Sequence, residues 1–260
     1  MIDGHVHLEK GPHTKEYVYE FIEEAIKKGI DELQILDHTH RFKEFLPIYD
    51  DCRVNKPQID WFERDFKDSI YSYINLIEEI KKEDLPIKVR FGLEVCYQES
   101  QEENIRKLVK GAYDWDFLVG SVHFVNNITY DCPWSKDELW NKYNVDDIYK
   151  RYYEMLINLV KSDLFTQLGH PDTIKMFNYY PSYDLTDTYN KLAEELNKHH
   201  VRPENNTGCY YRYNHKDMGL SDELLSIFKK HNCNLITASD AHYPKDVGSY
   251  IKEVWDKTMY

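Results

Sequence analysis

The sequence predicts an α/β fold, a closed parallel barrel built from seven β–α units. Short apolar runs alternate with longer amphipathic segments along the whole chain, and this alternation is typical of a parallel sheet whose strands are joined by helices. Seven such units suit a closed barrel. No repeat, low-complexity linker or Pro/Gly-rich joint interrupts the 260 residues, so we expect residues 1–260 to form a single domain.

The first half of the chain contains four of the expected strands. Residues 2–6 are a short apolar run, and the following segment carries apolar residues at helical spacing until Gly29 ends it. Pro86 introduces the third strand. The strands are expected at residues 2–6, 32–38, 87–95 and 116–123, with helices at residues 15–29 and about 61–82.

The second half contains the other three strands and four helices. The sixth strand, residues 201–207, is the least regular because Pro203 would interrupt a hydrogen-bonded ladder. The strands are expected at residues 164–170, 201–207 and 234–242, and the helices at about 146–162, 185–199 and 222–231, with a closing helix to about 257.

Composition excludes several classes of protein. Acidic residues outnumber basic ones by 46 to 33, and the resulting net charge of −13 disfavours non-specific binding of nucleic acid. No run approaches the roughly 18 apolar residues of a membrane span, and MIDGHVH has no signal-peptide pattern, so we expect a cytoplasmic protein. The five cysteines are scattered without a C-x-x-C pair, which disfavours both disulfides and thiolate metal sites.

Imidazole and carboxylate side chains stand at the ends of six of the seven expected strands. In a parallel barrel all carboxyl-terminal strand ends lie on one face, so residues remote in sequence should meet in one pocket. The residues in these positions are His5, His7, His38, Glu94, His123, His170, Asp240 and His242.

The spacing within the first and last strands favours metal binding. Because side chains alternate along a strand, His5 and His7 point to the same side, and Asp240 and His242 repeat that geometry. Imidazole and carboxylate without thiolate suit Zn²⁺, Mn²⁺ or iron, and a carboxylate such as Glu94 can bridge two ions.

Six short motifs, taken together, identify a family. The segments GHVH, DHTH, GLE, SVH, LGHPD and SDAH, from residue 3 to residue 242, resemble in order and spacing those of the PHP (polymerase and histidinol phosphatase) superfamily. The chain length, GPHT, HRFKEF and SVHF are most similar to stand-alone bacterial histidinol-phosphatases. The resemblance implies a distorted (β/α)7, TIM-like barrel that holds two or three divalent transition-metal ions (Zn, Mn or Fe).

The resemblance also implies which residues hold each ion. A first ion would be bound by His5, His7, Glu94 and Asp240, and a second by Glu94, His123 and His170. A third would be surrounded by His13, His38 and His242, with Glu9 as the possible substitute for His13.

Substrate phosphate also needs cationic donors. Lys175 in GHPDTIK and Arg212 after ENNTGCYY fall near positions where similar phosphatases carry phosphate-binding arginines, although either could be an ordinary solvated charge. Arg41, beside His38, and Asn206, after the sixth strand, are further candidates for substrate binding. His40 and His215 are additional candidates for a substrate contact, and Glu204 is expected to support the site.

The resemblance therefore implies a metal-dependent phosphomonoesterase that acts on a small molecule, L-histidinol phosphate. A hydroxide bridging two ions would attack phosphorus, Lys175 and Arg212 would stabilise charge, and Asp240 or His242 would deliver a proton to the leaving group. Four alternatives remain open: a protein-tyrosine phosphatase of the same superfamily, another small-molecule phosphoesterase, a nuclease or polymerase-associated module, and a non-catalytic metal-binding protein.

Overall fold

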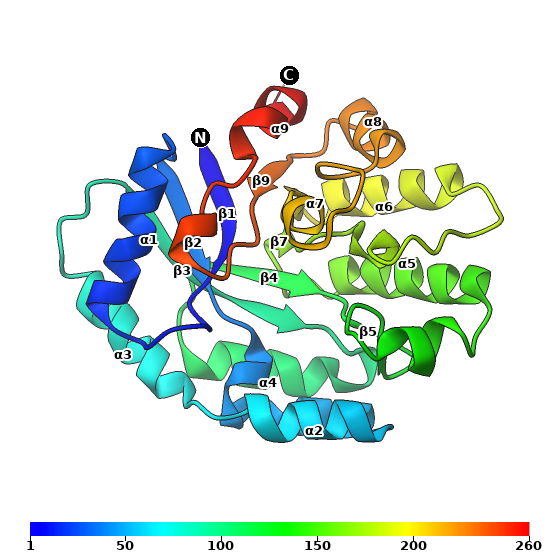
Figure 1. Ribbon diagram of the computed structural model, residues 1–260, viewed down its shortest axis with the longest axis horizontal. Helices are drawn as coiled ribbons and strands as arrows, with labels where there is room; N and C mark the ends of the chain where they lie inside the picture. Colours follow the sequence, from blue (N-terminus) through cyan, green and yellow to red (C-terminus); the bar gives the residue numbers. More distant parts are fainter. Residues whose placement is uncertain (260) are drawn as a thin grey trace.

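Seven parallel strands form a nearly closed barrel in the computed structural model, which describes residues 1–259 (Figure 1). Their order is β1-β2-β3-β4-β7-β8-β9. The first and last strands meet through backbone hydrogen bonds: the His7 N–H donates to the Ala241 carbonyl at 2.7 Å, and the Asp240 N–H donates to the His5 carbonyl at 2.9 Å. The predicted α/β barrel of seven parallel strands is confirmed.

The strands lie close to the predicted ranges. A short antiparallel hairpin, β5–β6, follows the fourth barrel strand and was not predicted. The barrel strands are β1 (Ile2–His7), β2 (Glu32–Leu36), β3 (Lys88–Cys96), β4 (Phe117–Ser121), β7 (Gln167–Leu168), β8 (Arg202–Asn206) and β9 (Ile236–Ala238), and the hairpin is β5 (Phe124–Val125) with β6 (Ile128–Thr129).

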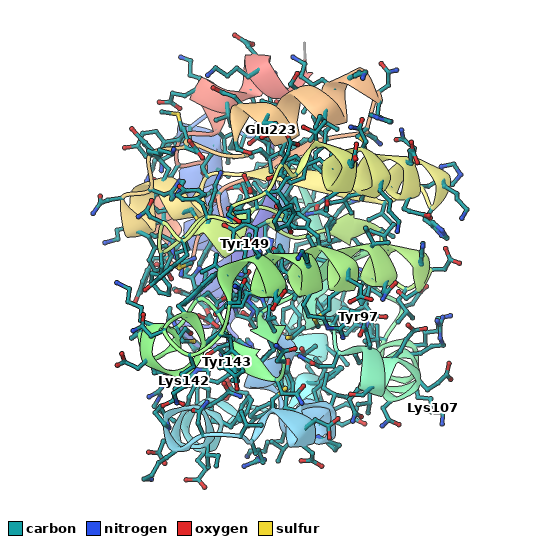
Figure 2. The ribbon with its side chains drawn as sticks, turned by 90° about the vertical axis from the view of Figure 1, so that its right-hand side faces the viewer. Tyr97, Lys107, Lys142, Tyr143, Tyr149 and Glu223 are labelled. Atoms are coloured by element: carbon teal, nitrogen blue, oxygen red, sulfur yellow. The ribbon has the colours of Figure 1, made fainter. Side chains whose placement is uncertain are left out.

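Helices surround the barrel and cover it with their apolar sides. Leu156 and Val160 of α5, for example, are fully buried. Figure 2 shows the side on which α5 and α6 run next to each other, with Tyr149 on α5 and Glu223 at the start of α8. The helices are α1 (Lys15–Lys27), α2 (Lys56–Asp65), α3 (Ile70–Ile80), α4 (Glu102–Ala112), α5 (Val145–Lys161), α6 (Thr186–Lys198), α7 (Gly208–Tyr213), α8 (Asp222–Lys230) and α9 (Ile251–Met259).

The prediction of a single helix at residues 61–82 was wrong, because two helices, α2 and α3, occupy this segment. Helix α2 begins earlier, where the Asn55 side chain accepts from the Gln58 N–H at 3.0 Å. A new helix begins at Ser69, whose hydroxyl caps α3, and Glu44 accepts a hydrogen bond from the Ile70 N–H at 2.9 Å. A carboxylate from a remote segment thus fixes the break, which local periodicity could not reveal.

Pro203 lies inside β8 without interrupting the barrel. The Arg202 N–H donates to the Thr166 carbonyl, on the side of β7, so the next residue along the strand would direct an N–H toward β9. Pairing with β9 begins only at Glu204, and Pro203 therefore occupies a position where no donor is needed.

Two further helices, α4 and the short α7, were not predicted. Helix α4 supplies the crossover between β3 and β4, and α7 follows β8 directly and carries Arg212. Among residues 1–259, no helix is long and apolar enough to cross a membrane.

Candidate metal centre

Glu94, at the end of β3, is the centre of the site. It is buried, and its two carboxylate oxygens face two different sets of imidazoles. Oε2 lies 3.2 Å from His5 Nε2, 3.3 Å from His7 Nε2 and 2.8 Å from His38 Nδ1, whereas Oε1 lies 3.0 Å from His123 Nε2 and 2.9 Å from His170 Nε2. Because each oxygen serves its own set of nitrogens, Glu94 has the geometry of a bridging ligand.

His5 and His7 lie on β1 and point to the same side, as their spacing predicted. Their Nε2 atoms are only 2.9 Å apart, and Glu94 and Asp240 direct carboxylate oxygens toward the same region. Two nitrogen lone pairs and two carboxylate oxygens at such short range suit a shared cation. The donor set therefore fits a metal ion, with nitrogen and oxygen ligands of the kind that zinc, manganese and iron accept.

Asp240 faces both the metal-binding residues and an arginine. Its Oδ1 lies 3.3 Å from His7 Nε2, and its Oδ2 lies 3.1 Å from Arg212 Nη1. Asp240 has a φ of 58° and His170 a φ of 26°, a conformation that costs roughly 1–3 kcal/mol at each residue that is not glycine. Such strain at two strand ends is typical of a functional site.

Glu9, rather than His13, lies beside His38 and His242. Glu9 oxygens lie 3.5 Å from His242 Nε2 and 3.9 Å from His38 Nε2. His13 points elsewhere: its Nε2 lies 3.2 Å from Asp37 Oδ2, and its Nδ1 lies 2.8 Å from the Ser72 hydroxyl. The structure therefore favours the substitute that the sequence left open and does not bring His13 to the site.

The described residues contain five overlapping groups of three potential metal ligands. Within each group, the donor atoms lie within 4.8 Å of one another. His40, which the sequence suggested for a substrate contact, belongs to one of them. The groups are His7/His38/His242, His5/His7/Asp240, His5/Glu94/His170, Glu9/His38/His40 and His38/Glu94/His123.

The surroundings of Glu94 and Asp240 favour the ionised form of both carboxylates. Burial raises the pKa of Glu94, but the neighbouring His38 and His5 outweigh this effect and hold the pKa well below its usual range. Burial likewise raises the pKa of Asp240, and the Arg212 guanidinium lowers it to well below its usual range. Both side chains thus carry the negative charge that a metal ligand needs.

Two imidazoles of the site are neutral. Burial lowers the pKa of His7 well below its usual range and that of His242 to about 4. Neutral imidazole is the form that binds a metal. By contrast, although burial lowers the pKa of His5, the Glu204 and Glu94 carboxylates raise it well above the usual range, so a bound cation would take the place of that proton.

Two carboxylates outside the cluster orient its histidines. Glu204 lies 2.8 Å from His5 Nδ1, as expected for a supporting residue, and Asp131 lies 2.8 Å from His123 Nδ1. Such contacts fix the imidazole tautomer and leave Nε2 free for the metal. Asp131 was missed because it follows the unpredicted β5–β6 hairpin, and no motif in the sequence marks it.

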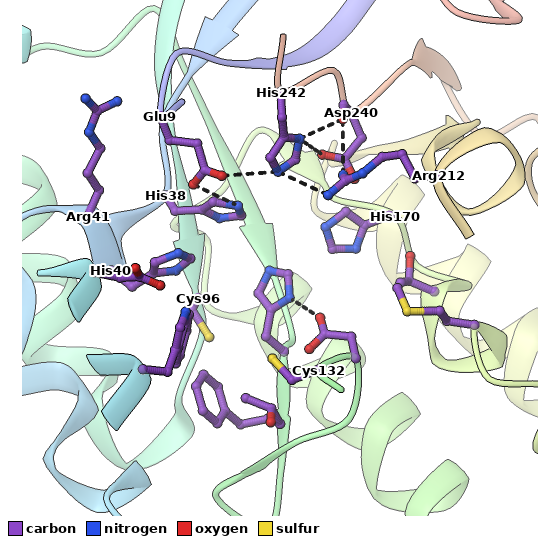
Figure 3. Close-up of a pocket in the computed structure, with 18 of the residues that line it drawn as sticks. Glu9, His38, His40, Arg41, Cys96, Cys132, His170, Arg212, Asp240 and His242 are labelled. Atoms are coloured by element: carbon purple, nitrogen blue, oxygen red, sulfur yellow. Dashed lines mark hydrogen bonds and ion pairs between the residues drawn. The ribbon is translucent and has the colours of Figure 1, made fainter. Parts of the chain in front are cut away.

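The two residues predicted to bind phosphate, Arg212 and Lys175, lie in different surroundings. Arg212 borders the cleft beside Asp240 and His242 (Figure 3). Lys175 is buried, and its ammonium contacts Asp172 Oδ2 at 2.6 Å, Asp217 Oδ2 at 2.9 Å and the Gly219 carbonyl at 3.1 Å. All three N–H donors of Lys175 have acceptors within the protein, so none is left for a phosphate.

Two other candidates for substrate binding also use their polar atoms within the protein. Asn206 donates to Glu204 Oε2 at 2.9 Å and accepts from the Gly208 N–H at 2.8 Å. Arg41 lines the cleft but donates to Asp37 Oδ2 at 2.7 Å, and Figure 3 shows its side chain apart from His242 and Arg212. His215 does not reach the cleft, because its ring contacts Tyr180 and the Asp217 N–H.

The cleft has a volume of about 260 Å³, and aromatic side chains are among the residues that line it. Trp61 lies with its ring centroid 4.8 Å from that of His40, and Phe124 lies 6.4 Å from Trp61. Metal-binding side chains, Arg212 and the rings of Trp61 and Phe124 line this space together. The cleft can thus hold both an anion and a small organic group.

Named proteins resemble this chain over most of its length. A probable histidinol-phosphatase of Deinococcus radiodurans is 24% identical over 267 residues, covering 98% of this chain and 93% of the relative. A probable histidinol-phosphatase of Schizosaccharomyces pombe is also 24% identical, covering 91% of this chain and 78% of the relative.

A solved structure shares the fold. The histidinol phosphate phosphatase of Lactococcus lactis, crystallised with zinc, L-histidinol and phosphate, superimposes with a TM-score of 0.69 at 17% identity and covers 100% of this chain and 94% of its own. The model of the PHP domain family matches residues 3–207, which include six of the seven strand ends that carry donor side chains or support them. With that match spanning most of the barrel, the chain belongs to the PHP domain family.

Proposed function

We propose that this protein is a metal-dependent phosphomonoesterase that hydrolyses L-histidinol phosphate to L-histidinol and phosphate. The observation that carries the proposal is the bridging geometry of Glu94, which joins two sets of imidazoles beside an open cleft. Relatives that share 24% of their residues with the chain bear the name of this activity. We also propose that residues 1–260 form one catalytic domain, because β1 and β9, from opposite ends of the chain, close the same barrel.

We propose that the buried histidines and carboxylates of the site bind two or three divalent ions of zinc, manganese or iron. Bound ions would lower the pKa of a coordinated water and neutralise charge on the phosphoryl oxygens. From the pairwise distances, the first ion would be held by His5, His7, Glu94 and Asp240, the second by Glu94, His123 and His170, and the third by Glu9, His38 and His242.

Asp240 and Arg212 have separate tasks in this proposal. Asp240 is ionised, so its carboxylate can accept a proton from the attacking water and pass it to the leaving oxygen as the bond from phosphorus to that oxygen breaks. His242, which also borders the cleft, is the alternative proton carrier. Arg212 directs its guanidinium toward the same space and would hold the phosphoryl oxygens.

Arg212→Ala should keep its full metal content and lose part of its activity. A charge-assisted contact contributes about 1.5–3 kcal/mol, so we expect kcat/KM to fall roughly 10- to 150-fold. Metal analysis and steady-state kinetics on the same preparation measure both effects, with Arg151→Ala, on the outer helix α5, as the control. A kinetically silent Arg212→Ala would mean that this arginine pairs with Asp240 without contacting the phosphate.

The protein should prefer histidinol phosphate to a generic aryl phosphate. The aromatic wall of Trp61, His40 and Phe124 can pack against an imidazole-bearing leaving group, and a preference of at least about tenfold in kcat/KM requires only about 1.4 kcal/mol. The test compares kcat/KM for L-histidinol phosphate, phenyl phosphate, a phosphotyrosine peptide and a phosphodiester. Equal efficiency on the first two would remove the substrate assignment and leave a phosphatase of another specificity.

A further inference from the structure

The loop that carries Glu9 is fastened at both ends by one buried ion pair. On one side of Glu9, the Leu8 N–H donates to Asp37 Oδ1 at 3.1 Å. On the other side, Arg41 Nη2 donates to the Gly11 carbonyl at 3.0 Å. Asp37 and Arg41 are themselves joined, Nη1 to Oδ2, at 2.7 Å.

This ion pair is sheltered, and each of the three guanidinium nitrogens has an acceptor within the protein. Asp37 is fully buried and Arg41 is 5% exposed. The third nitrogen of the guanidinium, Nε, contacts Asp68. A guanidinium can join three acceptors in three fixed directions, whereas an ammonium is a point charge on a flexible stem. The side chain at position 41 therefore ties a carboxylate, a loop carbonyl and a neighbouring segment into one arrangement.

The position of Glu9 depends on this loop. Its carboxylate, mostly buried, faces the Nε2 atoms of the His242 and His38 imidazoles. A shift of the backbone at residues 8 or 11 would carry Glu9 away from both nitrogens. Glu94 contacts Asp37 through the main chain, its N–H donating to the Asp37 carbonyl at 3.0 Å, a hydrogen bond that a change of the Arg41 side chain does not remove.

We propose that Arg41 and Asp37 are positioning residues for Glu9, which hold its loop so that one metal ion of the cluster is retained. The inference rests on the proposed metal centre and specifies how one of its sites is built. Arg41 contacts neither the metal nor the substrate in this account, in contrast to the substrate-binding role expected from the sequence.

Arg41→Lys is the test, because lysine keeps the positive charge and cannot reproduce the three-way fork. We expect the variant to bind one ion about 10- to 100-fold more weakly, as when other supporting residues of metal ligands are changed, while the other ions bind as in the wild type. Glu9→Gln should lose the same ion. The double variant Arg41→Lys/Glu9→Gln should then bind metal no more weakly than Glu9→Gln alone, because both changes remove one interaction.

The matched control is Arg106→Lys. Arg106 also joins a carboxylate, Glu102 at 3.1 Å, to a backbone carbonyl of another segment, Ser162 at 2.8 Å, but lies on α4 outside the site. Zinc titration followed by mass spectrometry of metal content gives the stoichiometry of every variant without any activity assay. For Arg41→Ala, added guanidinium should restore the lost ion, a readout that general destabilisation would not produce.

Three outcomes in the variants that change Arg41 would overturn the inference. They are full wild-type metal affinity in Arg41→Lys, loss of all ions together in that variant, and additive losses in the double variant. If Glu9→Gln kept all of its metal, the Glu9 site would fail, and with it this inference, whereas hydrolysis of histidinol phosphate would still be measurable as a separate result.

Discussion

Replacing Glu94 by glutamine is expected to remove most of the bound metal and to lower kcat by at least about 1,000-fold. The amide keeps the size of the side chain but removes the charge that faces two sets of imidazoles, with His38 Nδ1 at 2.8 Å and His123 Nε2 at 3.0 Å. Metal ions contribute several kcal/mol of charge stabilisation to such reactions, and each 1.4 kcal/mol is a factor of ten in rate.

The measurement is metal content by mass spectrometry together with kcat for L-histidinol phosphate. Glu103→Gln, at an exposed position on α4, makes the same chemical change away from the site and should behave as the wild type. Circular dichroism of Glu94→Gln should still show a folded barrel. Retention of both metal and activity by Glu94→Gln would mean that the cluster is assigned to the wrong residues.

Exhaustive chelation is expected to abolish activity, and Zn²⁺ or Mn²⁺ should restore it. The donor set contains mostly imidazole nitrogen, which suits transition metals, so Ca²⁺ and Mg²⁺, which prefer oxygen ligands, should restore little. The assay is phosphate release by chelated protein after addition of each ion, with the residual metal measured in the same sample. Full activity in protein verified to be free of metal would contradict the proposed chemistry.

Much of the barrel and of the cluster followed from the sequence because both depend on local rules. Alternating apolar and amphipathic segments predict parallel strands joined by helices, and a parallel barrel gathers its strand ends on one face. His5 and His7 lie together because side chains alternate along a strand, and Glu94 meets them because its strand ends at the same level.

Other features depend on contacts between remote segments and could not be read from spacing. The loop after β1 could have directed either His13 or Glu9 to the site, and the choice is set by Asp37, which lies on another segment and pairs with His13. Lys175 and Arg212 have the same formal charge in the sequence. Only the fold places Lys175 against Asp172 and Asp217, so that Arg212 is left at the cleft.

The most direct test of the central claim is the rate of phosphate release from L-histidinol phosphate as zinc is added stepwise to metal-free protein. The cluster of histidines around Glu94 predicts no release without metal and a rise to a plateau at two or three equivalents of zinc per chain. A rate that does not depend on zinc, or the absence of release at every zinc loading, would contradict the account.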